Sequence, residues 1–197
     1  MADFTVISQH LSSKFNLLQS FLQIEKRWEF RVIDFKGDSY IFKDFSTENN
    51  LFTILCDGET LIIDADDADK NFRITNNVKS GFIPIDGRTG LLGYGESHCD
   101  FIFFNENDFC FVEFKLNATS LEVRAIRKNR RKAVEQLGNT IDFFDKQLNS
   151  DYLGVNIEAY VCTPETYPRN DTAWESLSVE FLENFRIPLF ERSYKEY

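Results

Sequence analysis

The strongest restriction on the fold of this chain comes from two phenylalanine-rich segments that flank a polar turn. Residues 99–104 read CDFIFF and residues 109–116 read FCFVEFKL, with NEND between them. Short runs of aromatic and β-branched residues that end at turn-forming residues are typical of β-strands. We therefore predict two strands, Cys99–Phe104 and Phe109–Leu116, that pair as an antiparallel hairpin.

The length of the turn decides which side chains of this hairpin lie opposite one another. A loop of two or four residues pairs Phe104 with Phe109, and the same register places Asp100 opposite Glu113. A loop of three or five residues would break this pairing. Opposed side chains have Cβ atoms about 4.5–5.5 Å apart, so the two carboxylates would repel. A divalent cation would remove that repulsion, because hard cations bind oxygen ligands.

The alternation of side chains predicts two unequal faces for the hairpin. Lys115 follows Glu113 by two residues and so shares a face with it and with Asp100, together with Ile102 and Phe111. The other face is an apolar layer of Cys99, Phe101, Phe103, Cys110, Val112 and Phe114. We expect this layer to be core and the opposite face to carry the chemistry. The alternative is a half-exposed hairpin whose acids and lysine face water, because E-x-K triplets are common in strands.

Hydrophobic periodicity along the rest of the chain predicts a single mixed α/β or α+β domain over residues 1–197. Helices are expected at residues 4–28, 123–148 and 174–184. Further strands are expected at residues 30–35, 40–45, 51–56, 60–64 and 156–162, with an extended tail at 187–191. Residues 30–75 are interpreted as a strand-rich insertion. Residues 65–97 contain several glycines and are expected to form an irregular, mobile loop over a site.

The predicted helix at residues 123–148 begins with a basic cluster in an acidic chain. The formal net charge is -10 and the isoelectric point is near 4.7, which argues against a general nucleic-acid coat protein. A local basic patch can still guide a strand. We predict that nucleic acid contacts Arg124, Arg127, Lys128, Arg131 and Lys132, which cluster with Arg130. The alternative is a solvated helix face. Lys128, Lys132 and Gln136 recur every four residues and so form one row on this helix.

Two absences narrow the class of protein. The four cysteines form no C-x-x-C pair and the only histidines are His10 and His98, which argues against a structural zinc site. No run of about 18 apolar residues predicts a membrane span, and no export signal is evident. The expectation is therefore a cytoplasmic protein with reduced thiols and no membrane partner.

The hairpin motif resembles that of the PD-(D/E)XK nuclease superfamily, which has the restriction-endonuclease-like fold. The matching residues are HCD at 98–100 and VEFK at 112–115. The family core is a helix, a three-stranded antiparallel meander, a helix and a further strand, and the likeness covers roughly residues 95–162. The resemblance implies that Asp100 and Glu113 bind magnesium or manganese and that Lys115 orients or activates the attacking water. The family often has a proline before the aspartate, where this chain has Cys99.

The resemblance also implies supporting residues outside the hairpin. Many family members place a glutamine on the following helix, which assigns a supporting role to Gln136 within EQL at 135–137. A first-helix glutamate often assists the metal, which makes Glu25 a candidate ligand. Glu96 is a second candidate, because it shares strand parity with Asp100. His98 shares that parity too, and a structural histidine is the interpretation favoured over a ligand or base.

These observations predict a magnesium-dependent phosphodiesterase that cleaves nucleic acid, with DNA favoured by family analogy. A homodimer is left open. One alternative is a catalytically inactive nuclease-fold module that binds nucleic acid or protein. Another is an interaction protein, such as an antitoxin or inhibitor, whose acidic surface meets a basic partner.

Overall fold

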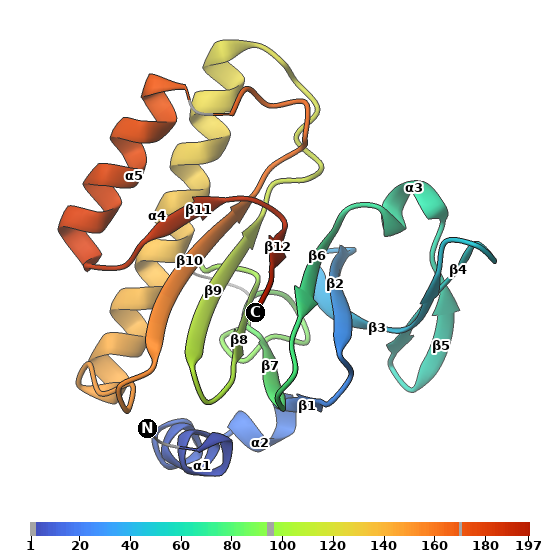
Figure 1. Cartoon of the computed structure of the whole chain (residues 1–197), viewed down its shortest axis with the longest axis vertical. Helices are drawn as coiled ribbons and strands as arrows, with labels where there is room; N and C mark the ends of the chain where they lie inside the picture. The colour runs from blue at the N-terminus through green and yellow to red at the C-terminus, as the bar shows by residue number, and fades with distance from the viewer. Residues whose placement is uncertain (1–2, 94–96, 170) are drawn as a thin grey trace.

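The structure is a computed structural model that describes residues 3–93, 97–169 and 171–197. Within these ranges the chain forms a mixed α/β fold with five helices and two six-stranded sheets (Figure 1). None of the helices in these ranges combines the length and the apolarity needed to cross a bilayer.

The central sheet contains the predicted hairpin. Its strand order is β1-β7-β8-β9-β10-β11, antiparallel from β1 to β9 and parallel from β9 to β11. The strands are β1 Gln23–Glu25, β7 Ser80–Pro84, β8 Phe101–Phe104, β9 Asp108–Phe114, β10 Asn156–Cys162 and β11 Leu189–Glu191. Phe101 pairs with Val112 and Phe104 with Phe109, which confirms the register predicted from the turn length.

The second sheet contains the strand-rich segment predicted at residues 30–75. Its order is β12-β6-β2-β3-β4-β5. The strands are β2 Glu29–Phe35, β3 Asp38–Ser46, β4 Leu51–Cys56, β5 Glu59–Ile62, β6 Asn71–Thr75 and β12 Tyr194–Lys195. The last strand pairs in parallel with β6, so the C-terminal segment leaves the central sheet after β11 and joins the second one.

Four helices pack on one face of the central sheet, and the second sheet packs against the other (Figure 1). The fifth, Ala65–Ala68, packs with the second sheet instead. The helices are α1 Phe4–Lys14, α2 Leu18–Phe21, α3 Ala65–Ala68, α4 Val123–Leu148 and α5 Thr172–Phe185. The predicted bounds of α4 are confirmed at both ends. It ends where Asn149 adopts the left-handed conformation, which asparagine tolerates better than most residues.

The predicted helix over residues 4–28 is wrong beyond Lys14. Phe15 is already extended, and α2 is a separate helix of four residues. Glu25 lies in β1, where it pairs with Ser80 of β7. The apolar residues after Lys14 match helical spacing, but pairing with a distant strand satisfies the backbone of residues 23–25 instead.

The irregular segment predicted at residues 65–97 is also partly wrong, because it contains β6 and β7. β7 is an inner strand of the central sheet, and all five of its residues are buried. A Cβ at Gly81 would lie 2.5 Å from the ring of Phe104 on the neighbouring strand. A side chain at position 81 would therefore clash with this ring, so Gly81 lets β7 pack closely against β8.

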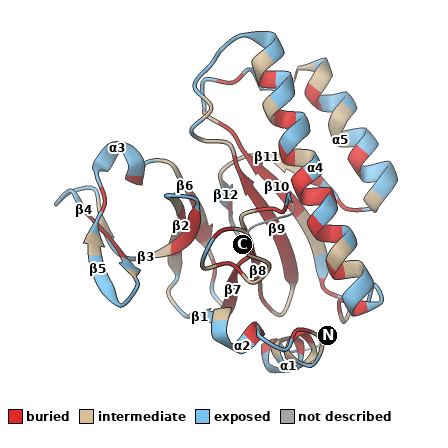
Figure 2. Ribbon diagram, turned by 180° about the vertical axis from the view of Figure 1, so that it is seen from behind, coloured by how far each residue is buried: buried red, intermediate tan, exposed pale blue. Residues whose placement is uncertain are grey.

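Both faces of the hairpin strands are buried, which contradicts the alternative of a half-exposed hairpin. Every residue of β8 and β9 is buried, and Figure 2 shows these strands in red. Phe111 packs with Leu137 of α4, whereas Phe101 packs with Phe72 of the second sheet. A strand covered on both sides reads as a continuous apolar run, which explains the two phenylalanine-rich segments.

Candidate active site

The carboxyl groups of Asp100 and Glu113 meet at the open end of the hairpin, and we call them the carboxyl pair. Asp100 directly precedes β8, and Glu113 lies in β9 next to the last registered pair. The backbone N–H of Phe114 donates to Oδ2 of Asp100 at 2.5 Å, which holds this carboxyl over the end of β9. The predicted apposition of the two acids is therefore present.

Lys115 and Gln136 complete a hydrogen-bonded chain beside the carboxyl pair. The Lys115 ammonium donates to Oε1 of Glu113, to Oε1 of Gln136 at 2.8 Å and to the carbonyl of Phe114 at 3.3 Å. The amide of Gln136 in turn donates to the carbonyl of His98 at 2.8 Å. The structure thus brings the four predicted catalytic residues together, with α4 supplying the glutamine.

Both carboxyls of the pair have raised pKa values. Burial raises the pKa of Asp100 to about 7, and the negative charge of Asp34 adds to this, while the N–H of Phe114 and the Lys115 ammonium oppose it. Burial and then the charge of Asp100 raise the pKa of Glu113. A hydrogen bond between the two carboxyls lowers the pKa of Asp100 and raises that of Glu113. The surroundings of the pair therefore disfavour the charged carboxylates, and a bound cation would favour them.

A buried threonine on α4, missed by the sequence analysis, fixes the glutamine and the start of the hairpin. The Thr140 hydroxyl donates to the carbonyl of Gln136 at 2.9 Å and accepts from the backbone N–H of Cys99 at 2.8 Å. Thr140 follows Gln136 by four residues and is fully buried. The sequence signal for this residue was its spacing, because Gln136 and Thr140 are four residues apart and therefore lie on the same side of the helix, beside its apolar stripe.

The carboxyl pair fits a divalent cation in charge and donor chemistry. Oε2 of Glu113 is buried and receives no hydrogen bond from an N–H, hydroxyl or ammonium group of the described residues. Across residues 3–93, 97–169 and 171–197, no third histidine, cysteine or acid joins the pair to form a larger ligand group. Magnesium commonly binds proteins through only one or two carboxylates and keeps several waters, so two ligands are sufficient.

Of the two further candidate ligands, the structure places Glu25 away from this site. Glu25 lies in β1 and pairs with Ser80, the first residue of β7. Asp100 lies near the opposite end of β7, where Pro84 pairs with Phe101. The Glu25 carboxylate accepts from the Arg27 guanidinium instead, at 2.9 Å. The prediction that Glu25 assists the metal from a first helix is therefore wrong in placement. Glu96 lies outside the described residues.

An acid from the second sheet reaches the site and was missed by the sequence analysis. Asp34 of β2 and Lys115 line the same small hollow of about 140 Å³, together with Lys70. Nearby, the Ser39 hydroxyl lies 3.4 Å from the carbonyl of Asp100. No local pattern pointed to Asp34, because its place depends on how the two sheets pack.

The predicted basic residues lie along the exposed side of α4, which leads away from Gln136. A hollow of about 1020 Å³, here called the α4 groove, is lined by Ser97, Val123, Arg124, Arg127, Lys128, Arg131, Lys132 and Glu135. It contains all five predicted nucleic-acid contacts, and all five are exposed. Ser97, which lies three residues before Asp100, connects the groove to the segment that leads into β8.

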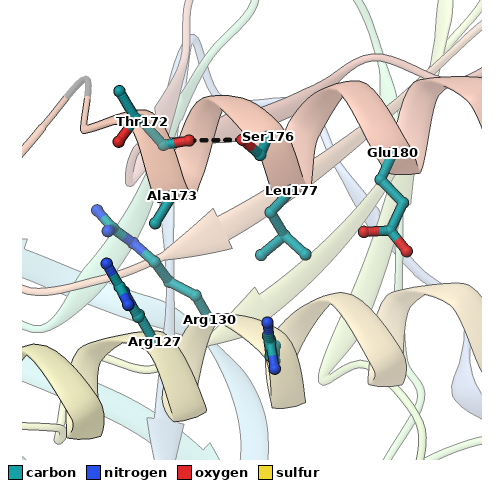
Figure 3. Close-up of a pocket in the computed structure, with 8 residues that line it drawn as sticks. Arg127, Arg130, Thr172, Ala173, Ser176, Leu177 and Glu180 are labelled. Atoms are coloured by element: carbon teal, nitrogen blue, oxygen red, sulfur yellow. Dashed lines mark hydrogen bonds between the residues drawn. The ribbon is translucent and has the colours of Figure 1, made fainter.

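Arg130, from the same sequence cluster, has a different position. It is 2% exposed and bonds to both oxygens of Glu191 at 2.7 Å and to the carbonyl of Pro168 at 2.7 Å. With Arg127 it points from α4 toward the first turn of α5, across a hollow of about 350 Å³ (Figure 3). Arg130 thus links α4 to β11 and to the loop at Pro168. It therefore differs from the five exposed cations of the same sequence cluster.

His98 is buried at the base of the site, and its ring packs edge-on against Phe143 with centroids 6.2 Å apart. Its backbone carbonyl, which accepts from Gln136, is the part that supports the site. Comparisons of this chain with protein-family models, with curated proteins and with solved structures gave no match.

Proposed function

We propose that this protein is a metal-dependent phosphodiesterase of the nuclease type, with DNA as the favoured substrate by analogy with the PD-(D/E)XK superfamily. The observation that carries the proposal is the carboxyl pair, in which the half-buried Asp100 lies beside the buried Glu113 and one buried oxygen of Glu113 has no donor among the described residues. A lysine touches this pair and is itself oriented by a glutamine.

The residues of the site have separate tasks in hydrolysis. A magnesium or manganese ion, when bound by Asp100 and Glu113, would polarise the scissile phosphate and make water more acidic. Lys115 would orient the water whose oxygen bonds to phosphorus and would stabilise the charge that develops as the ester P–O bond breaks. Gln136 holds the Lys115 ammonium in place. One water proton goes to the leaving oxygen and the other to solvent.

Two further observations support the proposal. The order β7-β8-β9, then α4, then β10 is the order of the core that the resemblance implies. The five exposed cations of the α4 groove lie beside the site in a chain of net charge -10, where a polyanion would otherwise be repelled.

One observation favours a different function, a nucleic-acid-binding module without catalysis. Glu113 is only 1% exposed, and the Lys115 ammonium already satisfies one of its oxygens. In that function Lys115 permanently neutralises Glu113, and the α4 groove alone binds the nucleic acid. The two functions differ in whether a divalent cation binds.

The deciding experiment measures cleavage of single-stranded and duplex DNA with magnesium or manganese. We compare wild type with Glu113→Ala and with Glu106→Ala, which removes an acid from the turn of the same hairpin. Cleavage by wild type and Glu106→Ala, with none by Glu113→Ala, supports hydrolysis at the carboxyl pair. Retained cleavage in Glu113→Ala rejects it, and so does an inactive wild type whose melting temperature is insensitive to manganese.

A further inference from the structure

The charges on the two sides of the carboxyl pair are unequal. On the α4 side, five exposed cations line one groove. Among the described residues, these five form no ion pair with an acid. A backbone that enters from this side meets cations that are available to replace its counterions.

On the side of the second sheet, two of the cations are already paired. Arg88 bonds to Asp57 at 2.9 Å, and Lys70 bonds to Asp67 at 2.9 Å. Asp34 faces the hollow beside Lys115, with the buried Asp38 close by on the same β-hairpin. Phosphates extending in this direction would meet net negative charge.

The cations of the groove lie along one face of α4, and the length of this row limits how many phosphates they can contact. Arg124 and Lys132 are eight residues apart, which corresponds to about 12 Å along the helix axis. Phosphates of one strand rise about 3.4 Å each along a duplex axis and lie farther apart in an extended single strand, so about three to five phosphates can lie beside these five cations. No aromatic side chain lines the groove within the described residues, so base stacking adds little and recognition depends on backbone charge.

We infer that the α4 groove is a track for one single-stranded segment, whose phosphates it binds on one side only of the scissile bond. This inference names the substrate class of the proposed hydrolysis and rests on that proposal for the position of the bond. A duplex is disfavoured because its second backbone would lie over acidic surface, in a chain with 32 acidic and 22 basic residues.

Binding in EDTA tests the track without cleavage. The probe is a fluorescent oligothymidylate, and its dissociation constant is measured by anisotropy at several salt concentrations. For three to five phosphates, log K should fall with log salt at a slope of about -2 to -3.5. Lys128→Ala should reduce the slope by about 0.7 and weaken binding about fivefold. Lys146→Ala, which removes an exposed cation from the last turn of the same helix, should change neither.

A length series tests whether the footprint is one-sided. Affinity should rise with oligothymidylate length up to about five nucleotides and then grow only slowly, whereas a two-sided footprint would continue to about ten. The track is overturned by equal effects of Lys128→Ala and Lys146→Ala, by a rise that continues to ten nucleotides, or by a duplex that binds more than about tenfold tighter. Groove-dependent binding without any cleavage would reject the hydrolysis proposal and leave the track in place.

Discussion

Two clusters on the central sheet contain the same residue types but differ in how completely their acids are paired. At one end of the sheet, Lys115 meets the carboxyl pair on the face that α4 covers. On the face toward the second sheet, Lys195 of β12 bonds to Glu158 of β10 at 2.6 Å and lies 3.6 Å from Asp108 of β9. Each cluster contains one lysine and two acids.

The difference between the clusters lies in their other donors. Tyr160 donates its hydroxyl proton to Glu158, and Asn156 donates to Asp108 at 3.3 Å. Within the described residues, neither of these acids has a buried oxygen that lacks a donor. Glu113 does have such an oxygen, and its acid neighbour raises its pKa.

The proposed site differs from the structural cluster in that one of its acids has an oxygen without a hydrogen-bond donor among the described residues. A cluster whose acids are fully paired gains nothing from an added cation, and here it fastens the C-terminal strand across both sheets. A cluster with excess negative charge is unfavourable by itself and becomes favourable when a cation binds. Substitutions in the two clusters should therefore affect activity and stability in opposite ways.

The largest expected effect is on catalysis at the carboxyl pair. Glu113→Gln should lower manganese-dependent cleavage by about 10³-fold or more, because it removes a cation ligand. Its melting temperature in EDTA should stay the same or rise, because the substitution removes the repulsion between the buried Glu113 and its neighbour Asp100. Cleavage assays and thermal unfolding measure both quantities, and a marked loss of stability would assign Glu113 a structural role instead.

The paired cluster should show the reverse behaviour. Lys195→Met keeps the side-chain length and removes the charge, which leaves the half-buried Glu158 and the buried Asp108 without their cation. The free energy of unfolding, measured in urea, should fall by about 3 kcal/mol. Cleavage per folded molecule should be unchanged. Lys146→Met, an exposed control, should change stability by less than about 0.5 kcal/mol, and equal losses for both variants would remove the contrast.

The pH dependence of stability should also separate the clusters. Because the folded pKa of Asp100 is raised to about 7, the native state binds more protons than the unfolded state between the unfolded pKa and 7. Stability should therefore fall as pH rises through this window, and the raised pKa of Glu113 adds to the decline in the same direction. Asp100→Asn should flatten this decline, and manganese should raise the melting temperature of wild type above pH 7 more than at pH 5. Equal slopes in both proteins would contradict the assignment.

The smallest effect is expected at Gln136, which acts through Lys115. Gln136→Leu should lower kcat about tenfold with little change in KM, because it removes one hydrogen bond that orients the ammonium. Gln147→Leu, an exposed substitution on the same helix, should leave both constants unchanged. A rise in KM alone would indicate that Gln136 contacts substrate directly.

The sequence by itself determined the elements whose signals are local. Turn length and alternation set the register of β8 and β9, and therefore the meeting of Asp100 with Glu113. Helical periodicity gave both ends of α4, and with them the position of Gln136 beside Lys115. These predictions succeeded because each depends on residues that are close along the chain or joined by one short turn.

Only the tertiary structure decided what surrounds the site. The second sheet buries the face of the hairpin that looked like ordinary core, and it brings Asp34 beside Lys115. The same packing separates Arg130 from its exposed neighbours and moves Glu25 from a predicted helix into β1. Strand pairing and sheet packing join residues far apart in sequence, so their outcome depends on competing long-range contacts that no local pattern records.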